Sequence, residues 1–268
     1  MQIVLLILTI AGSIPIGLAL WANRATSLCH ALVWTLIAWL SWGVAFLLAD
    51  IQIAGIEPGR YCALCLAGCA GVAVLGARRP HVFAWNFVVL GLFAVMVLPL
   101  VETHFIGTHS LGSLRIFFMA GTIAVGILNY LPTRLAPAAA LLMIVCSAEV
   151  VLLYSPAWLP RLDERIFDLL LTAVPWVAWI CLKRSNANRS AFDRLWLSFR
   201  DRWGLVWSQR VREQFNHAAE HAGWPVKLTW QGLVQEMNTP ALAPADQEKL
   251  VATLRATLQR FLAADQYF

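Results

Sequence analysis

The sequence from residue 81 to residue 101 is HVFAWNFVVLGLFAVMVLPLV, which contains no Asp, Glu, Lys or Arg. A helix that crosses the hydrocarbon core of a bilayer needs roughly 20 mostly apolar residues. His81–Val101 meets this requirement, so it predicts a membrane-spanning helix. Comparable stretches lie on both sides of it along the chain, and together they decide the fold class.

The chain as a whole is strongly apolar, because 60% of its 268 residues are hydrophobic and only 13% are charged. A soluble domain usually carries about 25% charged residues. Residues 1–182 contain eight Arg, no Lys and seven acidic residues, whereas residues 183–268 contain twelve Lys or Arg and eight acidic residues. This uneven distribution predicts two domains, a transmembrane helical bundle over 1–182 and a cytoplasmic tail domain over 183–268.

Six further stretches have nearly the length and composition of a membrane span. The third of the seven is short and rich in Gly and Ala, which allow close helix packing in lipid, so we expect it inside the bundle. The predicted fold is all-α: a polytopic membrane bundle of about seven transmembrane helices with a small, mainly helical soluble tail. The predicted spans are Ile3–Trp21, Cys29–Ala49, Tyr61–Ala77, His81–Val101, Leu114–Leu131, Leu135–Tyr154 and Ile166–Leu182.

Basic residues near the helix ends predict the orientation of such a bundle. An odd number of spans places the N-terminus and the tail on opposite sides. The side of the tail has eight cations and the other side has four, which predicts a multi-pass protein with its N-terminus outside and its tail in the cytoplasm. The excess of Arg over Lys is typical of a bacterial genome rich in G and C, and the predicted location is a bacterial cytoplasmic (inner) membrane. The eight are Arg24, Arg78, Arg79, Arg134, Lys183, Arg184, Arg189 and Arg194, and the four are Arg60, Arg115, Arg161 and Arg165.

The tail has a helical pattern of its own. From Phe192 onward, apolar residues recur every four positions and polar residues occupy the other faces, which predicts an amphipathic helix that ends at Gly223. A short strand is expected at Val226–Trp230. A second helix is expected from about Pro244 to Ala264, with proline at its first position and acidic residues in its first turn.

The first tail helix combines tryptophans with flanking cations, which favours a position in the headgroup layer beside anionic lipid. The alternative is that its apolar stripe forms an internal core or faces a partner protein. Nucleic acid is not an expected partner, because acidic residues interrupt the basic run. The residues proposed for membrane-surface or partner contact are Arg194, Trp196, Phe199, Arg202, Trp203, Trp207 and Arg210.

Ionisable side chains within the predicted spans are few. Buried carboxylates in lipid are costly and usually face the bundle interior or a wet cavity. Glu149 is the stronger candidate for a functional group, because Asp168 lies near the start of its helix and could reach the interface. Asn86, and Asn129 near the inner end of the fifth span, are expected to hydrogen-bond between helices. These positions support one alternative function, a small-molecule or lipid permease with a cavity near Glu149.

A second alternative is a haem- or metal-binding redox protein. His30 and His81 fall at similar depth, as in a bundle that holds a b-type haem. Glu102, His104 and His109 form a candidate metal site on the opposite side. Both patterns also suit ordinary helix ends and loops, so no cofactor is predicted.

Two further patterns, one of cysteines and one of histidines, have a structural explanation. Cys62, Cys65 and Cys69 share one helix face and suit a metal centre, but in a helix rich in Gly and Ala they are expected to be small packing residues. His217 and His221 with Glu220 match a zinc-peptidase pattern. The tail is too small for that fold, and the pair lies at a helix end where the helix dipole favours histidine.

The functional prediction is a non-catalytic scaffold, accessory subunit or sensor. The chain contains no nucleotide-binding glycine loop and no G-x-S-x-G motif, which removes the usual reasons to predict an enzyme. Seven spans suggest a comparison with rhodopsins, but Ile166–Leu182 contains no Lys for a retinal Schiff base. The lipid bilayer, anionic headgroups and other subunits of a membrane complex are the expected partners.

Overall fold

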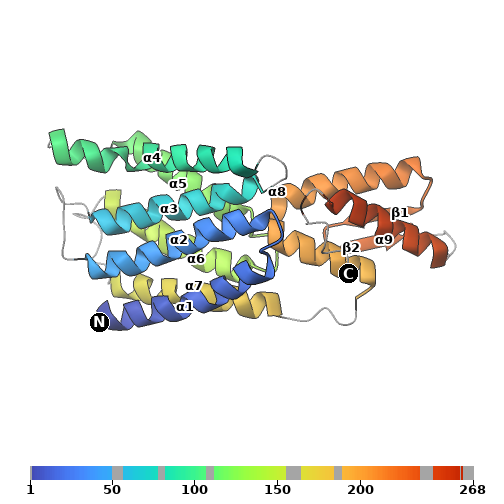
Figure 1. Cartoon of the computed structure of the whole chain (residues 1–268), viewed down its shortest axis with the longest axis horizontal. Coiled ribbons are helices and arrows are strands. Elements are labelled where there is room, and N and C mark those ends of the chain that lie inside the picture. Colours follow the sequence, from blue (N-terminus) through green and yellow to red (C-terminus); the bar gives the residue numbers. More distant parts are fainter. Residues whose placement is uncertain are drawn as a thin grey trace.

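The computed structural model describes residues 2–49, 57–77, 82–106, 112–154, 164–183, 189–235, 244–259 and 261. Seven helices lie side by side in a bundle, and the tail lies at the end of the bundle away from the N-terminus (Figure 1). The bundle helices are α1 Gln2–Ala22, α2 Leu28–Leu47, α3 Pro58–Leu75, α4 Val82–Ile106, α5 Ser113–Leu128, α6 Ala136–Tyr154 and α7 Glu164–Lys183.

Each predicted span corresponds to one of these helices. Six of them, α1 to α4, α6 and α7, are long and apolar enough to cross a membrane. The α5 helix has 16 residues and is shorter than that limit. Among the described residues, six helices thus qualify as candidate membrane spans, whereas the sequence predicts seven.

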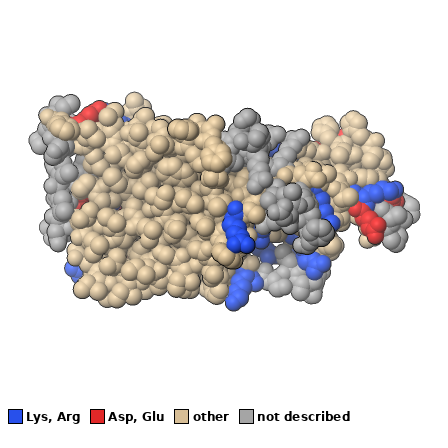
Figure 2. Space-filling model, in the orientation of Figure 1, with Lys and Arg blue, Asp and Glu red and all other residues tan. Residues whose placement is uncertain are grey.

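The outer surface of the bundle is apolar. Large hydrophobic side chains point away from it, including Phe83, Phe87 and Leu114, whose side chains are 74%, 77% and 82% exposed. Figure 2 shows that this side of the bundle displays no Lys, Arg, Asp or Glu over most of its length. A soluble monomer rarely exposes so continuous an apolar surface. The surface is that expected of helices surrounded by lipid.

The third helix occupies the interior, as its small residues predict. In α3, 61% of the span is buried, against 22–39% in the other five candidate spans. The absence of a side chain at Gly71 and at Gly126 of α5 allows the two backbones to approach, because a Cβ atom on either would lie 2.6 Å from the other's Cα. The helix therefore serves as the central element against which α2, α4 and α5 pack.

The tail consists of α8 Ala191–His221, β1 Val226–Thr229, β2 Gly232–Gln235 and α9 Pro244–Leu258. The strands form an antiparallel hairpin in which Val226 pairs with Gln235 and Thr229 with Gly232. The prediction of β1 is confirmed, but β2 was not predicted. The helix after Pro244 ends at Leu258, six residues before the predicted end, and residues 262–264 lie outside the described part of the chain.

The prediction of one continuous first tail helix is wrong at Gly204. This residue has φ 75° and ψ −166°, so α8 is two helical segments joined by a kink. Such a conformation is essentially restricted to glycine. The apolar periodicity continues through the kink, which is why the sequence pattern did not reveal it.

The apolar stripe of α8 forms the core of the tail. Phe199, Trp203 and Trp207 are buried, and all three rings pack around Phe261 with centroids 5.0–6.0 Å from its ring. Phe192 packs on Phe215 in the same way, at 5.2 Å. Of the two interpretations of the stripe, burial favours the internal core for these aromatic side chains.

Candidate functional site

A buried ion network joins three helices at the end of the bundle away from the tail. Arg60 of α3 donates from Nη1 to Glu149 of α6 at 2.8 Å and binds Asp168 of α7 through two parallel hydrogen bonds of 2.9 Å. Its Nε lies 2.9 Å from a carboxylate oxygen of Glu57. Arg60, Glu149 and Asp168 are all buried. One guanidinium therefore holds together carboxylates from α6, from α7 and from the residue that precedes α3.

The antiparallel order of the helices brings these groups to the same depth. Arg60 is the third residue of α3 and Asp168 the fifth of α7, whereas Glu149 lies five residues before the end of α6. The planar guanidinium binds the Asp168 carboxylate through two parallel N–H groups and still has a donor for Glu149, whereas an ammonium group lacks this planar fork. Removing one partner from such a buried pair usually costs about 3–5 kcal/mol.

This network corrects two sequence-based assignments. The charge count places Arg60 among the four cations of the outer side, but it is buried among carboxylates and contributes little positive charge to that side. The place of Asp168 near the start of its helix suggests that it could reach the interface, but it is buried and binds Arg60 at 2.9 Å, close to the 2.8 Å of Glu149. A lone Arg at the start of the most interior helix was the signal that could have identified the partner of both carboxylates.

A second cluster joins the tail to the other end of the bundle, and Asn129 lies at its centre. The kink at Gly204 begins a new helical segment, whose first amide groups have no partner within the helix. Leu205 N donates to the carbonyl oxygen of Asn129 at 2.7 Å, and Val206 N donates to its side-chain Oδ1 at 3.0 Å. Asn129 is also the C-cap residue of α5. The end of a bundle helix thus caps the start of a tail helix.

Asp201 connects the same turn of the bundle to α8. Its Oδ1 accepts from Arg134 N at 3.2 Å and from Arg200 Nη2 at 2.7 Å. Arg200 also donates to the carbonyl of Trp230 at 2.9 Å, and Trp230 Nε1 donates to Pro132 O at 2.6 Å. These hydrogen bonds connect the α5–α6 turn, α8 and the hairpin to one another.

Tyr130 adds another contact from this turn. Its hydroxyl donates to Arg202 O at 3.0 Å. Burial raises the pKa of Tyr130, so the hydroxyl stays protonated and remains a donor.

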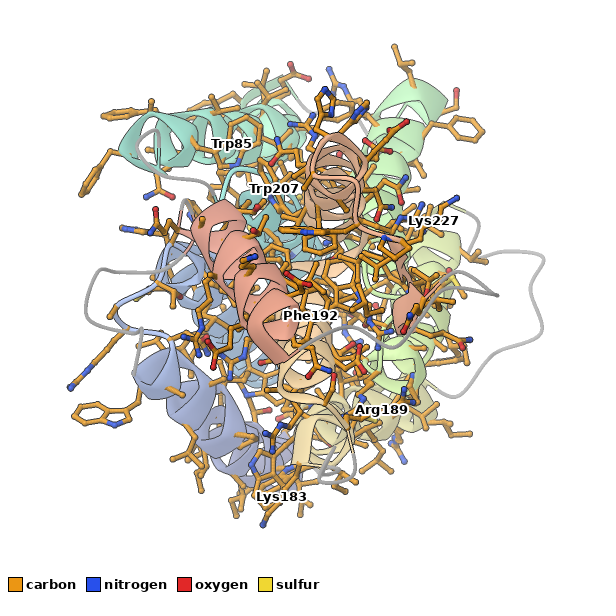
Figure 3. The ribbon with its side chains drawn as sticks, turned by 90° about the vertical axis from the view of Figure 1, so that its right-hand side faces the viewer. Trp85, Lys183, Arg189, Phe192, Trp207 and Lys227 are labelled. Carbon is orange, nitrogen blue, oxygen red and sulfur yellow. The ribbon has the colours of Figure 1, made fainter. Side chains whose placement is uncertain are left out.

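Two further contacts attach the tail to α2 and α3. Trp207 Nε1 donates to Val74 O at 3.0 Å, in the last turn of α3, where helix carbonyls need external donors. Within the bundle, Trp85 Nε1 of α4 donates to Val72 O of the same turn at 3.2 Å. Figure 3 labels both tryptophans. Ser27 N, before α2, donates to Phe261 O at 3.3 Å. The tail is therefore bound to the bundle at the start of α2, at the end of α3 and at the α5–α6 turn.

The candidate haem pair is placed only in part. His30 Nδ1 lies 3.2 Å from Asn86 Nδ2, and its ring packs edge-on against Phe83. Trp34 Nε1 donates to Asn86 Oδ1 at 3.3 Å. Asn86 thus makes the predicted interhelical bonds, while His81 lies outside the described residues. The contacts of His30 suit a polar bridge between α2 and α4.

The candidate metal site at the opposite end is also placed in part. Glu102 forms an ion pair with Arg115 at 2.7 Å. The side chain of His104, and His109 as a whole, lie outside the described part of the structure. Among the residues that are described, no group of three or more His, Cys, Asp or Glu side chains could hold a metal ion.

The remaining patterns have local structural contacts. Cys65 and Cys69 are buried and free, and their Sγ atoms lie 3.8 Å from the carbonyls of Met96 and Val89 on α4. His221 Nδ1 lies 2.8 Å from the carbonyl of His217, one turn earlier. These contacts agree with packing and helix-end explanations.

The tail residues proposed for surface contact divide into two groups. The aromatic members are buried inside the tail or at its junction with the bundle. The cationic members, Arg194, Arg202 and Arg210, are exposed. The exposed cations remain available to a membrane or a partner. The buried members are Trp196, Phe199, Trp203 and Trp207.

No protein-family model matches this chain, and searches of curated proteins and of solved structures found no match.

Proposed function

We propose that this chain is a non-catalytic, multi-pass membrane scaffold, acting as an accessory subunit or sensor that holds its C-terminal domain at one membrane surface. The observation that carries the proposal is the bundle–tail junction, in which Asn129 caps α8 and Asp201 joins the tail to the α5–α6 turn. A tethered catalytic domain needs only a linker. A junction of this breadth instead fixes the position of the tail relative to the bilayer.

The proposal includes seven membrane crossings, with α5 as the seventh. The ends of α5 support this assignment. Arg115, near its start, pairs with Glu102 at the end of α4, and Asn129, at its end, binds the tail. A helix of 16 residues is about 24 Å long at 1.5 Å per residue. Central packing of α5 against α3 suits a short crossing.

The proposed location is a bacterial cytoplasmic membrane, with the N-terminus outside and the tail in the cytoplasm. The burial of Arg60 strengthens the argument from positive charge, because one of the four cations counted on the outer side is neutralised within the bundle. The partners proposed are the lipid bilayer and other subunits of a membrane complex.

The permease alternative loses its main support. Glu149 is the carboxylate on which it depended, and this group accepts a 2.8 Å hydrogen bond from Arg60. A substrate that used Glu149 would have to compete with a buried ion pair. The observed geometry stabilises the bundle more directly than it suits transport.

The test is to purify the full chain, tagged at its N-terminus, from its native membrane in mild detergent. We expect one set of partner proteins in constant ratio, and the loss of that set when residues 189–268 are deleted. Size-exclusion chromatography of the deletion variant checks that the bundle still folds. A solitary full-length chain, together with altered substrate flux in Glu149→Gln, would favour the permease and overturn the scaffold.

A further inference from the structure

Two tryptophan–cation pairs lie at the tail end of the bundle. Arg24 Cζ lies 4.1 Å from the ring centroid of Trp21, and Lys183 Nζ lies 4.5 Å from that of Trp179. Trp21 lies in the last turn of α1 and Arg24 follows that helix, whereas Trp179 and Lys183 both lie at the end of α7. These two helices run in the same direction and pack against each other, so their last turns lie at the same level (Figure 1).

We propose that these two pairs form a binding surface for anionic phospholipid headgroups in the leaflet on the side of the tail. The proposal rests on the membrane placement made above. It assigns lipid contact to the ends of α1 and α7, whereas the sequence pattern had suggested the aromatic stripe of α8.

The exposure of the tryptophans is the first argument. Trp21 is 66% exposed and Trp179 is 36% exposed, while Trp196 and Trp203 of the tail are buried. An indole ring has an apolar body and one polar N–H group, and tryptophans accordingly concentrate at the level of lipid headgroups. The exposed rings therefore mark the boundary between hydrocarbon and water.

The charge around these rings is the second argument. None of the described residues 15–27 and 176–183 is acidic. Figure 2 shows Lys and Arg gathered where the uncharged side of the bundle meets the tail. A guanidinium or ammonium group pairs well with a lipid phosphate, and a net negative headgroup adds attraction that a zwitterionic one lacks.

The helix dipole offers a second explanation for both cations, because positive charge is favourable at a helix C-terminus. The dipole accounts for Arg24 and Lys183, but it does not account for an exposed tryptophan beside each. A headgroup site accounts for cation and ring together. The two explanations differ in what removal of the cations does to lipid binding.

The test uses the full chain in nanodiscs that contain equal amounts of phosphatidylglycerol and phosphatidylcholine. Mass spectrometry then measures the association constant of each retained lipid. We expect wild type to prefer phosphatidylglycerol, and the preference to fall about fivefold for each cation removed in Arg24→Gln and Lys183→Gln, as expected for one basic residue near an anionic surface. Trp21→Ala with Trp179→Ala should weaken retention of both lipids.

Lys227→Gln is the matched control. It also removes one positive charge, but from an exposed position of β1 in the tail itself (Figure 3). An unchanged preference in the double variant Arg24→Gln/Lys183→Gln would overturn the lipid site, as would an equal decrease in Lys227→Gln. A wild-type chain that does not enter nanodiscs would overturn the membrane placement, and with it the lipid site.

Discussion

A guanidinium group that loses water on folding must regain hydrogen bonds from the protein, and Arg60 regains them from carboxylates on α6 and α7. Each of those carboxylates has the same requirement, since a buried ionised group without a partner is strongly unfavourable. Charge is therefore tolerated inside the apolar bundle only because all members are present together. This mutual dependence makes single substitutions more damaging than combined ones.

We predict that Arg60→Met lowers the free energy of unfolding by about 3–5 kcal/mol, because it leaves Glu149 and Asp168 buried without their cation. Denaturant unfolding in detergent micelles would measure this. Arg115→Met is the control, since its pair with Glu102 is partly exposed and should contribute no more than about 1 kcal/mol.

The triple variant Arg60→Met/Glu149→Gln/Asp168→Asn should recover much of the lost stability, because it removes the buried charges together. A triple variant no more stable than Arg60→Met would contradict this account of the network. It would indicate that the shape of the arginine, rather than its charge, holds the helices.

Gly204 is the second residue on which the fold depends. We predict that Gly204→Ala destabilises the protein by about 1–3 kcal/mol, because its backbone conformation is almost exclusive to glycine. The new Cβ would also collide with Asn129. Thermal unfolding would measure the change. Gly223→Ala, at φ 68° but with no atom within 4 Å of the new Cβ, should be less damaging, so equal effects would contradict a role for the junction.

At the scale of elements, α8 is two segments with different surroundings. The first is joined to the hairpin by Arg200, and the second starts at the kink, where Asn129 supplies the cap. A helix start without a cap loses about 1 kcal/mol. The bundle therefore stabilises the tail through its secondary structure as well as by packing.

We predict that Asn129→Ala speeds hydrogen exchange at the amide of Val206, because its acceptor Oδ1 is lost. Asn216→Ala is the matched control. It removes the asparagine that bonds Leu228 N at 2.7 Å, so it should speed exchange in β1 and leave Val206 unchanged. The same exchange pattern in both variants would show general loosening of the tail instead of a local cap.

At the scale of the whole molecule, the N-terminus and the tail lie at opposite ends of the bundle (Figure 1). If the bundle crosses a membrane, these two parts lie on opposite sides of it. The tail is held against the end of the bundle by contacts with α2, α3 and the α5–α6 turn. The tail is thus held at a fixed position relative to the end of the bundle.

Reporter fusions test this topology. Green fluorescent protein fused after Phe268 should be fluorescent, and alkaline phosphatase at the same position should be inactive, because we expect the tail in the cytoplasm. Chains truncated and fused after Gly112 and after Pro132 should give phosphatase activity and fluorescence respectively if α5 crosses the membrane. The same reporter active at both positions would exclude a crossing by α5.

Local composition and periodicity determined the positions of the helices, because the length of an apolar run and the spacing of its residues are properties of neighbours along the chain. They predicted α3 as the interior helix and Asn86 as a bridge between helices. They also predicted the start of α9 at Pro244.

Only the tertiary structure decided which distant residues meet. Arg60 and Asp168 are 108 positions apart, and Asn129 and Val206 are 77 apart. No local pattern specifies those pairings. The sequence showed isolated charges and a continuous apolar stripe, whereas packing joined the charges into one network and turned the stripe inward. The physical reason is that a buried polar group is stable only beside its partners, and the assembly of the helices determines which partners come within reach.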